Sequence, residues 1–123
     1  EIDANVLTHD SSQKLFCSKN AASKSIRDSS DEYLSSEKAF EAMFDESERS
    51  SNLESADPTD VQAEILYASK VPHEYIKKVH FSSRANKKKF KPQINGKPSQ
   101  ISEQSGGLYS SRSYCRQNGV KKT

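Results

Sequence analysis

Apolar residues in this chain are sparse, and their clearest periodic pattern lies between residues 31 and 46. Four apolar side chains recur there at the spacing of one helical face: Tyr33, Phe40, Met43 and Phe44. Ser29 with Glu32 three positions later has the form of a capping box, and acidic residues in the first turns favour the start of a helix. The pattern predicts an amphipathic helix over 31–46, near the N-terminus.

Alternating patterns later in the chain predict short strands. Residues 75–81 alternate apolar and polar side chains, and residues 90–94 form a second short apolar stretch. A third strand is expected from Leu108 to Cys115, with turns at Asn95-Gly96 and Gly106-Gly107. We expect these strands to form a small antiparallel sheet against the helix.

The segment after Asp57 allows two interpretations. Pro58 at a first helical position, with Val61 and Ile65 on one side, favours a helix, which is the interpretation we prefer. The same stretch also alternates in the manner of a strand, through Val61, Ala63, Ile65 and Tyr67.

Polar segments separate and flank these elements. Residues 18–30 and 47–57 are predicted loops, residues 1–14 a polar lead-in, and residues 116–123 a basic tail. One helix followed by several short strands predicts an α+β fold. We expect a single domain over 1–123, with flexible ends and its core between about residues 15 and 115.

The composition leaves room for only a modest core. Leu, Ile, Val and Phe together number 22, about 18% of the chain, a share at which disorder becomes a candidate. The net charge of +2 hides a segregation: residues 28–64 hold twelve acidic against two basic side chains, whereas residues 70–123 hold thirteen basic against two acidic. These are either two solvated faces or a basic half that meets phosphate or an acidic partner. No apolar run approaches the ~18 residues of a membrane span.

The two cysteines, Cys17 and Cys115, lie near opposite ends of the chain. Neither has a metal ligand at close spacing, which argues against a zinc site. As a disulfide they would close one long loop and stabilise a core-poor domain by about 4 to 5 kcal/mol in the loop-closure model. That bond implies a secreted protein, and the alternative is a pair of thiols in an intracellular one.

The segment Val71-Pro72-His73-Glu74-Tyr75 resembles the Tyr-Pro-His-x-Tyr motif of the small fungal guanyl-specific ribonucleases. The resemblance extends to the preceding helix, to a disulfide from end to end, and to the aromatic-Pro strand and turn over 90–97. It implies a microbial ribonuclease-like fold in which His73 stands where the family activates the ribose hydroxyl.

The chain differs from that family at the positions of the family's catalytic residues. Lys87-Lys88-Lys89 stand where the family has its glutamate base, and lysine is protonated at neutral pH. No histidine follows His80 to act as the acid; Gln104 and Ser105 lie near that place. Arg112 is a candidate phosphate contact, and His73 is at most vestigial. We therefore expect no enzymatic activity and no cofactor.

A ribonuclease-like scaffold without catalysis resembles the secreted effectors of powdery mildew fungi, which act by binding inside the plant cell. The resemblance implies a monomer that meets a host protein, an immune receptor or RNA in the host cytoplasm or nucleus, with no membrane. The physical basis for binding is a basic run with one aromatic ring. The candidate residues are Arg84, Lys87, Lys88, Lys89, Phe90, Lys91 and Arg112.

Two rival hypotheses remain open. The 22 serines, many beside acidic residues, suit a largely disordered interaction segment of a nuclear or cytosolic protein. The residues around Tyr33 to Phe44 would then fold as a helix on a partner. The third hypothesis is an active ribonuclease that uses His73 with other partners.

Overall fold

The computed structural model describes residues 1–94 and 110–119, together with the backbone of 100–103. The strands in these residues are β1 (Lys14–Cys17), β2 (Glu64–Tyr67), β3 (Lys78–Phe81) and β4 (Gln100–Glu103). The helices are α1 (Lys24–Arg27), α2 (Asp31–Leu34), α3 (Glu37–Ala42), α4 (Arg84–Phe90) and α5 (Arg112–Asn118). Short 3₁₀ helices occupy Ala4–Thr8, Glu46–Glu48, His73–Tyr75 and Lys91–Gln93. The expected α+β class is confirmed.

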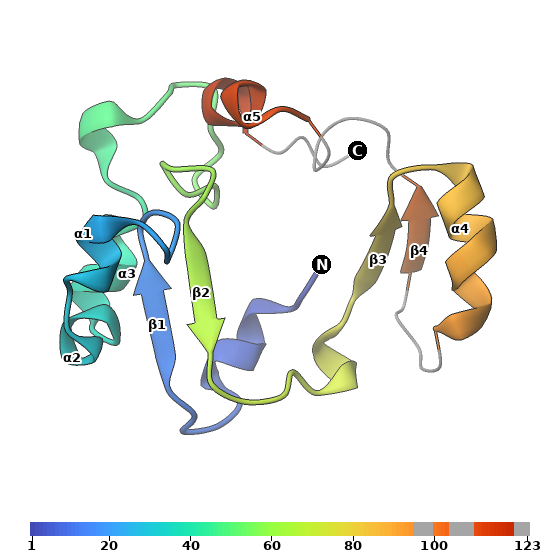
Figure 1. The fold of residues 1–123 in the computed structure, drawn as a ribbon, viewed down its shortest axis with the longest axis horizontal. Helices are drawn as coiled ribbons and strands as arrows, with labels where there is room; N and C mark the ends of the chain where they lie inside the picture. The colour runs from blue at the N-terminus through green and yellow to red at the C-terminus, as the bar shows by residue number, and fades with distance from the viewer. Residues whose placement is uncertain (95–99, 104–109, 120–123) are drawn as a thin grey trace.

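Strands β1 and β2 form an antiparallel pair that carries three of the helices. Cys17 pairs with Glu64 at one end of the pair, and Lys14 pairs with Tyr67 at the other. Helices α2 and α3 contact β1, and Figure 1 shows α1, α2 and α3 together beside that strand. The helices therefore cover the β1 side and leave β2 facing the rest of the chain.

The core of this part is small and lies between β1 and the helices. Cys17, Ile26 and Leu34 form one buried cluster, against which Leu15 and Ala21 pack. Ala39 and Met43 of the α3 region are also buried. Burying each such aliphatic side chain contributes about 1.5–3 kcal/mol, so stability here rests on few residues.

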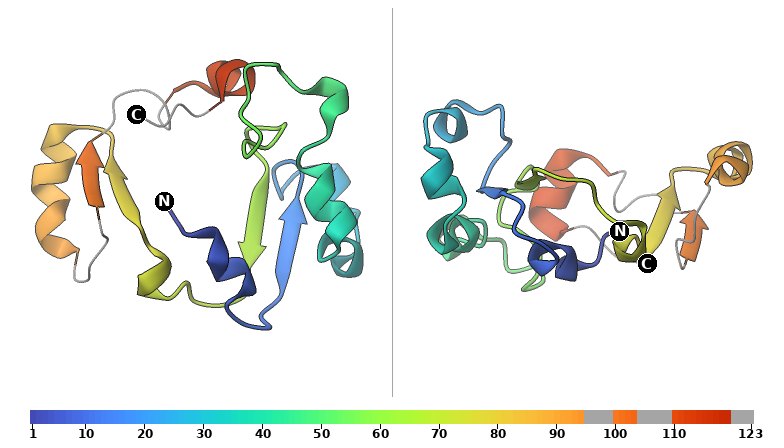
Figure 2. Two further views of the ribbon diagram at one scale, coloured as in Figure 1. Left: turned by 180° about the vertical axis from the view of Figure 1, so that it is seen from behind. Right: turned by 90° about the horizontal axis from the view of Figure 1, so that it is seen from below.

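Strands β3 and β4 form a second, parallel pair with α4 as the crossover between them. Lys78 pairs with Gln100 and Phe81 with Glu103. Helix α4 contacts both strands, and Figures 1 and 2 show it on the outer side of this strand pair. The basic α4 and the acidic helices α2 and α3 therefore lie at opposite sides of the molecule.

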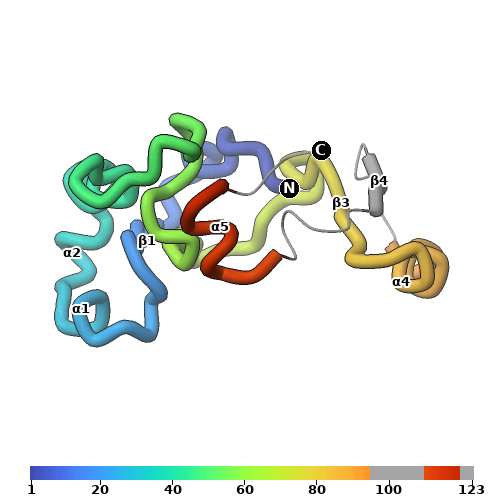
Figure 3. Tube along the Cα trace, turned by 90° about the horizontal axis from the view of Figure 1, so that it is seen from above, coloured from blue at the N-terminus to red at the C-terminus, as the bar shows by residue number. Residues whose placement is uncertain are grey.

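Helix α5 brings the end of the chain back to the loop between α3 and β2. Figure 3 shows α5 alongside the chain of residues 45–60, and Ser50 Oγ donates a hydrogen bond of 2.8 Å to Gln117 O. Cys115 is buried on the inner side of α5, where it lines a small pocket with Leu53 and Val61. The loop is thus covered by a helix distant in sequence.

The first residues pack against the segment that precedes β3. Ile2 forms an antiparallel bridge with Ile76, and Asp3 N donates to Tyr75 O at 2.8 Å. Val6 is buried. This segment, expected to be a flexible lead-in, makes defined contacts in the structure.

The predicted helix over 31–46 is interrupted. Ser36 is extended and caps a new helix, its hydroxyl accepting a hydrogen bond from Ala39 N, so α2 ends at Leu34 and α3 begins at Glu37. The cap of α2 is Ser30 rather than Ser29. Two serine caps within seven residues favour two short helices over one long one, and the predicted continuous amphipathic helix is wrong.

Other predicted elements also change type. The segment preferred as a helix after Pro58 contains strand β2. The predicted strand at 90–94 is the end of α4 with a 3₁₀ turn, and the last part of the predicted strand from Leu108 to Cys115 lies in α5. The predicted strand over 75–81 is correct in its second half only, because β3 covers Lys78–Phe81 and a 3₁₀ helix ends at Tyr75. Both predicted glycine turns lie outside the described residues.

The predicted disulfide is not present. Cys17 and Cys115 are both thiols in the described part of the chain, and each is buried in a different place. Cys17 lies under α1 and α2, while Cys115 lies in α5, with its Sγ 3.9 Å from Ser110 O. Secretion, inferred from that bond, stays a prediction. Within the described residues, no helix has the length and apolar character to cross a membrane.

Candidate functional site

The candidate site is a cavity of about 580 Å³ at the end of the antiparallel pair where Cys17 faces Glu64. Its wall comes from the residues that follow β1, from the loop between α3 and β2, and from α5. Three hydroxyl residues line it, Ser18, Ser47 and Thr59. The charged residues of the wall are Lys19, Asp45, Glu48, Asp60 and Arg116. A volume of this size suits a small molecule.

Glu64 is the first residue of β2 and lies next to this cavity in sequence and in the sheet, although it is not part of the wall. Of the strand residues whose side chains are described, Glu64 is the only one that carries a carboxylate. Its Oε1 accepts a hydrogen bond of 2.6 Å from Ala21 N. A rigid strand and a backbone donor therefore fix the direction of this carboxylate, and Oε2 is left to face other groups.

The turn that holds Glu64 is determined locally by Asn20. The side chain of Asn20 accepts from Ala22 N at 2.8 Å, and its carbonyl accepts from Ser23 N at 2.8 Å. This Asx turn follows the general preference of Asn for such positions, and it presents Ala21 N to Glu64.

The acidity of the Cys17 thiol is affected by its surroundings. Burial, and then the nearby Glu64 carboxylate, raise the pKa of this thiol.

Arg49 stabilises the loop that forms one wall. Its side chain is only 8% exposed, and its guanidinium donates to Thr59 Oγ1 at 3.2 Å and to Glu54 O. Thr59 Oγ1 in turn donates to Asp45 O at 2.7 Å. These bonds tie together both ends of the loop, so the wall does not depend on regular secondary structure.

The donors and acceptors of the cavity suit a ligand with sugar hydroxyls and phosphate. Carboxylates at Asp45, Glu48 and Asp60 can accept from hydroxyl groups, while Lys19 and Arg116 can face a phosphate. Arg116 Nη2 also lies 3.5 Å from Gln62 Oε1, which directs it over the loop. Acids outnumber bases here, so a phosphate group is favoured only on the Lys19 and Arg116 side.

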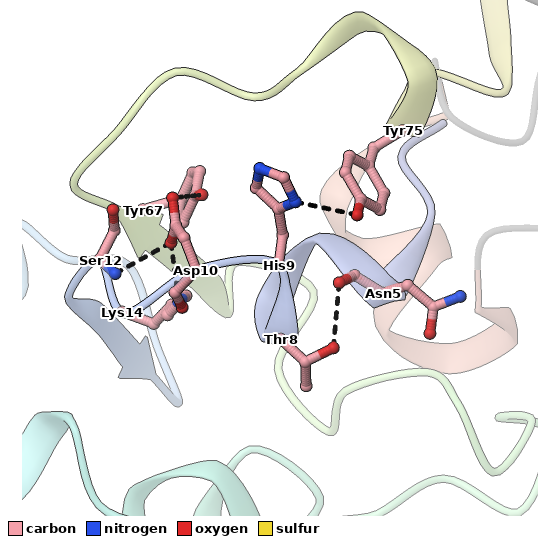
Figure 4. Close-up of polar contacts among 8 residues, drawn as sticks. All are labelled: Asn5, Thr8, His9, Asp10, Ser12, Lys14, Tyr67 and Tyr75. Carbon is pink, nitrogen blue, oxygen red and sulfur yellow. Dashed lines mark hydrogen bonds and ion pairs between the residues drawn. The ribbon is translucent and has the colours of Figure 1, made fainter.

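A second polar cluster lies at the opposite end of the same strands, where Lys14 pairs with Tyr67 (Figure 4). Asp10 accepts from Tyr67 Oη at 2.8 Å, from Ser12 N at 2.9 Å and from Lys14 Nζ at 3.3 Å. Nearby, His9 Nδ1 lies 3.0 Å from Tyr75 Oη. The cluster ties the N-terminal segment to β2 and to the segment before β3.

These contacts shift the acidity of Asp10 and Tyr67 in opposite directions. Partial desolvation alone would raise the pKa of Asp10, but hydrogen bonds from Ser12, Tyr67 and Lys14 outweigh it and lower that pKa to about 2. Desolvation, followed by the Asp10 carboxylate, raises the pKa of Tyr67. Asp10 therefore stays ionised in the folded protein at acidic pH values where an ordinary carboxyl group is protonated.

Tyr67→Phe is expected to weaken the acid resistance of this cluster. A carboxyl group whose pKa is lower in the folded than in the unfolded protein stabilises the fold at pH values above its ordinary pKa of 3.8. This contribution is lost as the pH falls from about 4 to about 2. Without the tyrosine hydroxyl, the pKa of Asp10 moves up towards 3.8 and the pH dependence shrinks. Carboxyl ¹³C titration of Asp10 and thermal unfolding from pH 2 to 5 measure both effects. Tyr33→Phe is the matched control because Tyr33 is exposed, and an unshifted Asp10 in Tyr67→Phe would contradict the assignment.

The structure separates the residues that the sequence suggested for a binding site. His73 is an exposed 3₁₀ residue with its Nδ1 3.6 Å from Glu74 Oε2, away from the cavity. Arg112 begins α5, which lies apart from α4 in Figures 1 and 2. The basic run, in contrast, is brought together on α4. Within the described residues no His, Cys, Asp and Glu side chains group as a metal site.

Comparison with known proteins gives one family. The family model described as "DarT: ssDNA thymidine ADP-ribosyltransferase" matches residues 1–108, which is most of the chain. The chain belongs to the DarT family. No curated protein matches the sequence.

Membership of the DarT family corrects the predicted identity and function. The family is one of ADP-ribosyltransferases, so the predicted ribonuclease-like scaffold, the RNA-binding effector and the absence of enzymatic activity are wrong. The alternative of a disordered segment is not supported either, because residues 1–94 form successive helices and strands. A host protein or receptor as partner and the monomeric state stay predictions.

No motif in the sequence marked the residues that line the cavity or those beside it. Glu64 lies inside the alternating stretch from Val61 to Tyr67, and the strand interpretation would have marked it as a carboxylate among apolar strand residues. Lys19 and Arg49 belong to no motif, because each lies in a polar segment that was predicted to be a loop. Only the return of α5 places Arg116 beside them.

Proposed function

We propose that this chain transfers ADP-ribose from NAD⁺ to thymidine in single-stranded DNA, with Glu64 as the carboxylate at the reacting bond. The family supports the reaction class. The observation that carries the proposal is the fixed Glu64 carboxylate beside a cavity whose polar groups suit sugar and phosphate.

The residues of the cavity fit NAD⁺ as a ligand. Lys19 and Arg116 would hold the diphosphate, and the carboxylates of Asp45 and Asp60 would accept from ribose hydroxyls. When bound, NAD⁺ supplies an activated glycosidic bond to a leaving group that departs as neutral nicotinamide. The contribution of this chain is to bind and orient that bond.

Glu64 would act on the charge that develops at the sugar. Cleavage of a glycosidic bond creates positive charge on the sugar ring, and a carboxylate fixed beside it stabilises the transition state. Glu64 is held for this role by Ala21 N through Oε1, which leaves Oε2 for the reacting centre. Oε2 can also accept the proton that thymidine loses as its new bond to ribose forms.

The test is an assay with NAD⁺ and three oligonucleotides of equal length. One is single-stranded with thymidine, one is single-stranded with cytidine in its place, and one is the duplex of the first. Mass spectrometry is expected to show added ADP-ribose on the first alone. A folded protein that leaves all three unmodified would overturn the proposal.

A further inference from the structure

Helix α4 is short, basic and defined at its start by a clear cap. Ser83 Oγ accepts from Asn86 N at 3.2 Å, and Asn86 Nδ2 donates to Ser82 Oγ at 3.0 Å. The helix runs over Arg84–Phe90 and continues as the 3₁₀ turn Lys91–Gln93. Unbranched lysine side chains suit a helix, so the segment orders its cations instead of leaving them on a loop.

Four of these cations share one face of α4. Arg84, Lys87, Lys88 and Lys91 follow the spacing i, i+3, i+4 and i+7, which places them in one stripe about 10 Å long. The same four, with Pro92, line a shallow hollow of about 530 Å³. Lys89 points elsewhere, and its Nζ lies 5.1 Å from the centre of the Phe90 ring.

Nothing in the described residues neutralises this stripe. None of the ion pairs between described residues includes any of its four members. Residues 82–94 contain no acidic residue. Like charges at these spacings repel and destabilise a helix, so the arrangement is unfavourable unless an anion binds to it.

We propose that this face of α4, which we name the α4 stripe, binds successive phosphates of single-stranded DNA. A stacked strand carries one phosphate per about 3.4 Å of its helix axis, so a stripe about 10 Å long spans about three phosphates along that axis. Phe90 is 39% exposed at the edge of the stripe, where its ring can stack on an unpaired base. The choice of single-stranded DNA rests on the proposed function, whereas the phosphate site rests on α4 alone.

The test measures binding of a fluorescein-labelled oligothymidylate by anisotropy over a series of salt concentrations. The triple variant Lys87→Gln, Lys88→Gln, Lys91→Gln is expected to bind about 100-fold more weakly at low salt. Each lost contact should also reduce the slope of log K against log salt by about 0.7. Glutamine preserves helix propensity, and circular dichroism with thermal unfolding confirms that the variant is folded.

The matched control removes the same charge elsewhere, as Lys24→Gln, Lys38→Gln, Lys70→Gln. This control is expected to stay within about threefold of the wild type, because its lysines lie outside α4. Equal weakening of both triple variants would mean a general charge effect and would overturn the site. Phe90→Leu should weaken binding of the oligothymidylate by about fivefold or more, while the slope of log K against log salt stays unchanged. An unchanged affinity would overturn the assignment to a single strand.

Further outcomes distinguish this proposal from binding of other anions and from the proposed function. Stronger binding to vesicles containing phosphatidylserine, or to poly-glutamate, than to the oligothymidylate at equal charge would overturn the proposal. Binding through α4 without transfer would refute only the proposed function, and transfer without loss in the α4 triple variant would refute only the α4 stripe.

Discussion

Glu64→Gln is expected to lower the rate of ADP-ribosyl transfer by about 10²–10³-fold at saturating NAD⁺ and oligonucleotide. The substitution removes the negative charge that would face the sugar, while its amide oxygen can still accept the hydrogen bond from Ala21 N. The turn around Asn20 should therefore keep its shape. The measurement is kcat for ADP-ribose incorporation, together with the thermal unfolding midpoint of the same preparation.

Two further variants separate charge from position. Glu64→Asp keeps the charge but withdraws it by one methylene group, and a loss comparable to that of glutamine would show that placement matters as much as charge. Glu41→Gln removes an exposed carboxylate from α3 and should leave kcat unchanged. Wild-type turnover in Glu64→Gln would remove the carboxylate from the mechanism.

The fold class could be read from the sequence because local patterns are sufficient for it. Residues 31–34 and 37–42 are helical for reasons of the kind that the pattern gave, namely serine caps and acidic first turns. The break at Ser36 was missed because periodicity is counted over a window that spans both helices. A serine in the middle of a helical pattern competes for the backbone and is itself a signal for a new start.

The type of the ambiguous segment after Asp57 depended on a partner far away in the chain. Glu64–Tyr67 is a strand because it pairs with Lys14–Cys17, some fifty residues earlier. The helix α4, in contrast, begins at a local cap, Ser83, which lies one residue before the basic residues that drew the binding prediction. Tertiary pairing decides such short segments over intrinsic propensity.

The site could not be derived because its parts come from separate loops and a returning helix. The motif around His73 attracted attention through its letters, yet the structure leaves that side chain exposed. The disulfide was predicted from the positions of the cysteines near the two ends, the small core and the family resemblance, although bridging also requires that the two cysteines lie close together. Buried Cys17 instead packs in a cluster with Ile26 and Leu34. Of the suggested binding residues, Arg84, Lys87, Lys88 and Lys91 share a surface.

Gly119→Ala is expected to lower the free energy of unfolding by about 2 to 3 kcal/mol. Gly119 ends α5 at φ 67° and ψ −179°, a conformation that is essentially confined to glycine and costs other residues about 1–3 kcal/mol. A Cβ at this position would also lie 2.5 Å from Asp57 Oδ2, which accepts from Glu54 N. Chemical denaturation followed by circular dichroism measures the change.

A double-mutant cycle with Asp57→Ala separates the two causes of that loss. Asp57→Ala removes the clash but not the backbone strain, so the double variant should lose less than the sum of the two single variants. Gly119→Asn should not restore stability, because asparagine tolerates the left-handed helical region but not this extended ψ. Since α5 also carries Arg116 at the cavity, Gly119→Ala should weaken NAD⁺ binding as well. Wild-type stability in Gly119→Ala would mean that the chain leaves α5 by another path than the one described.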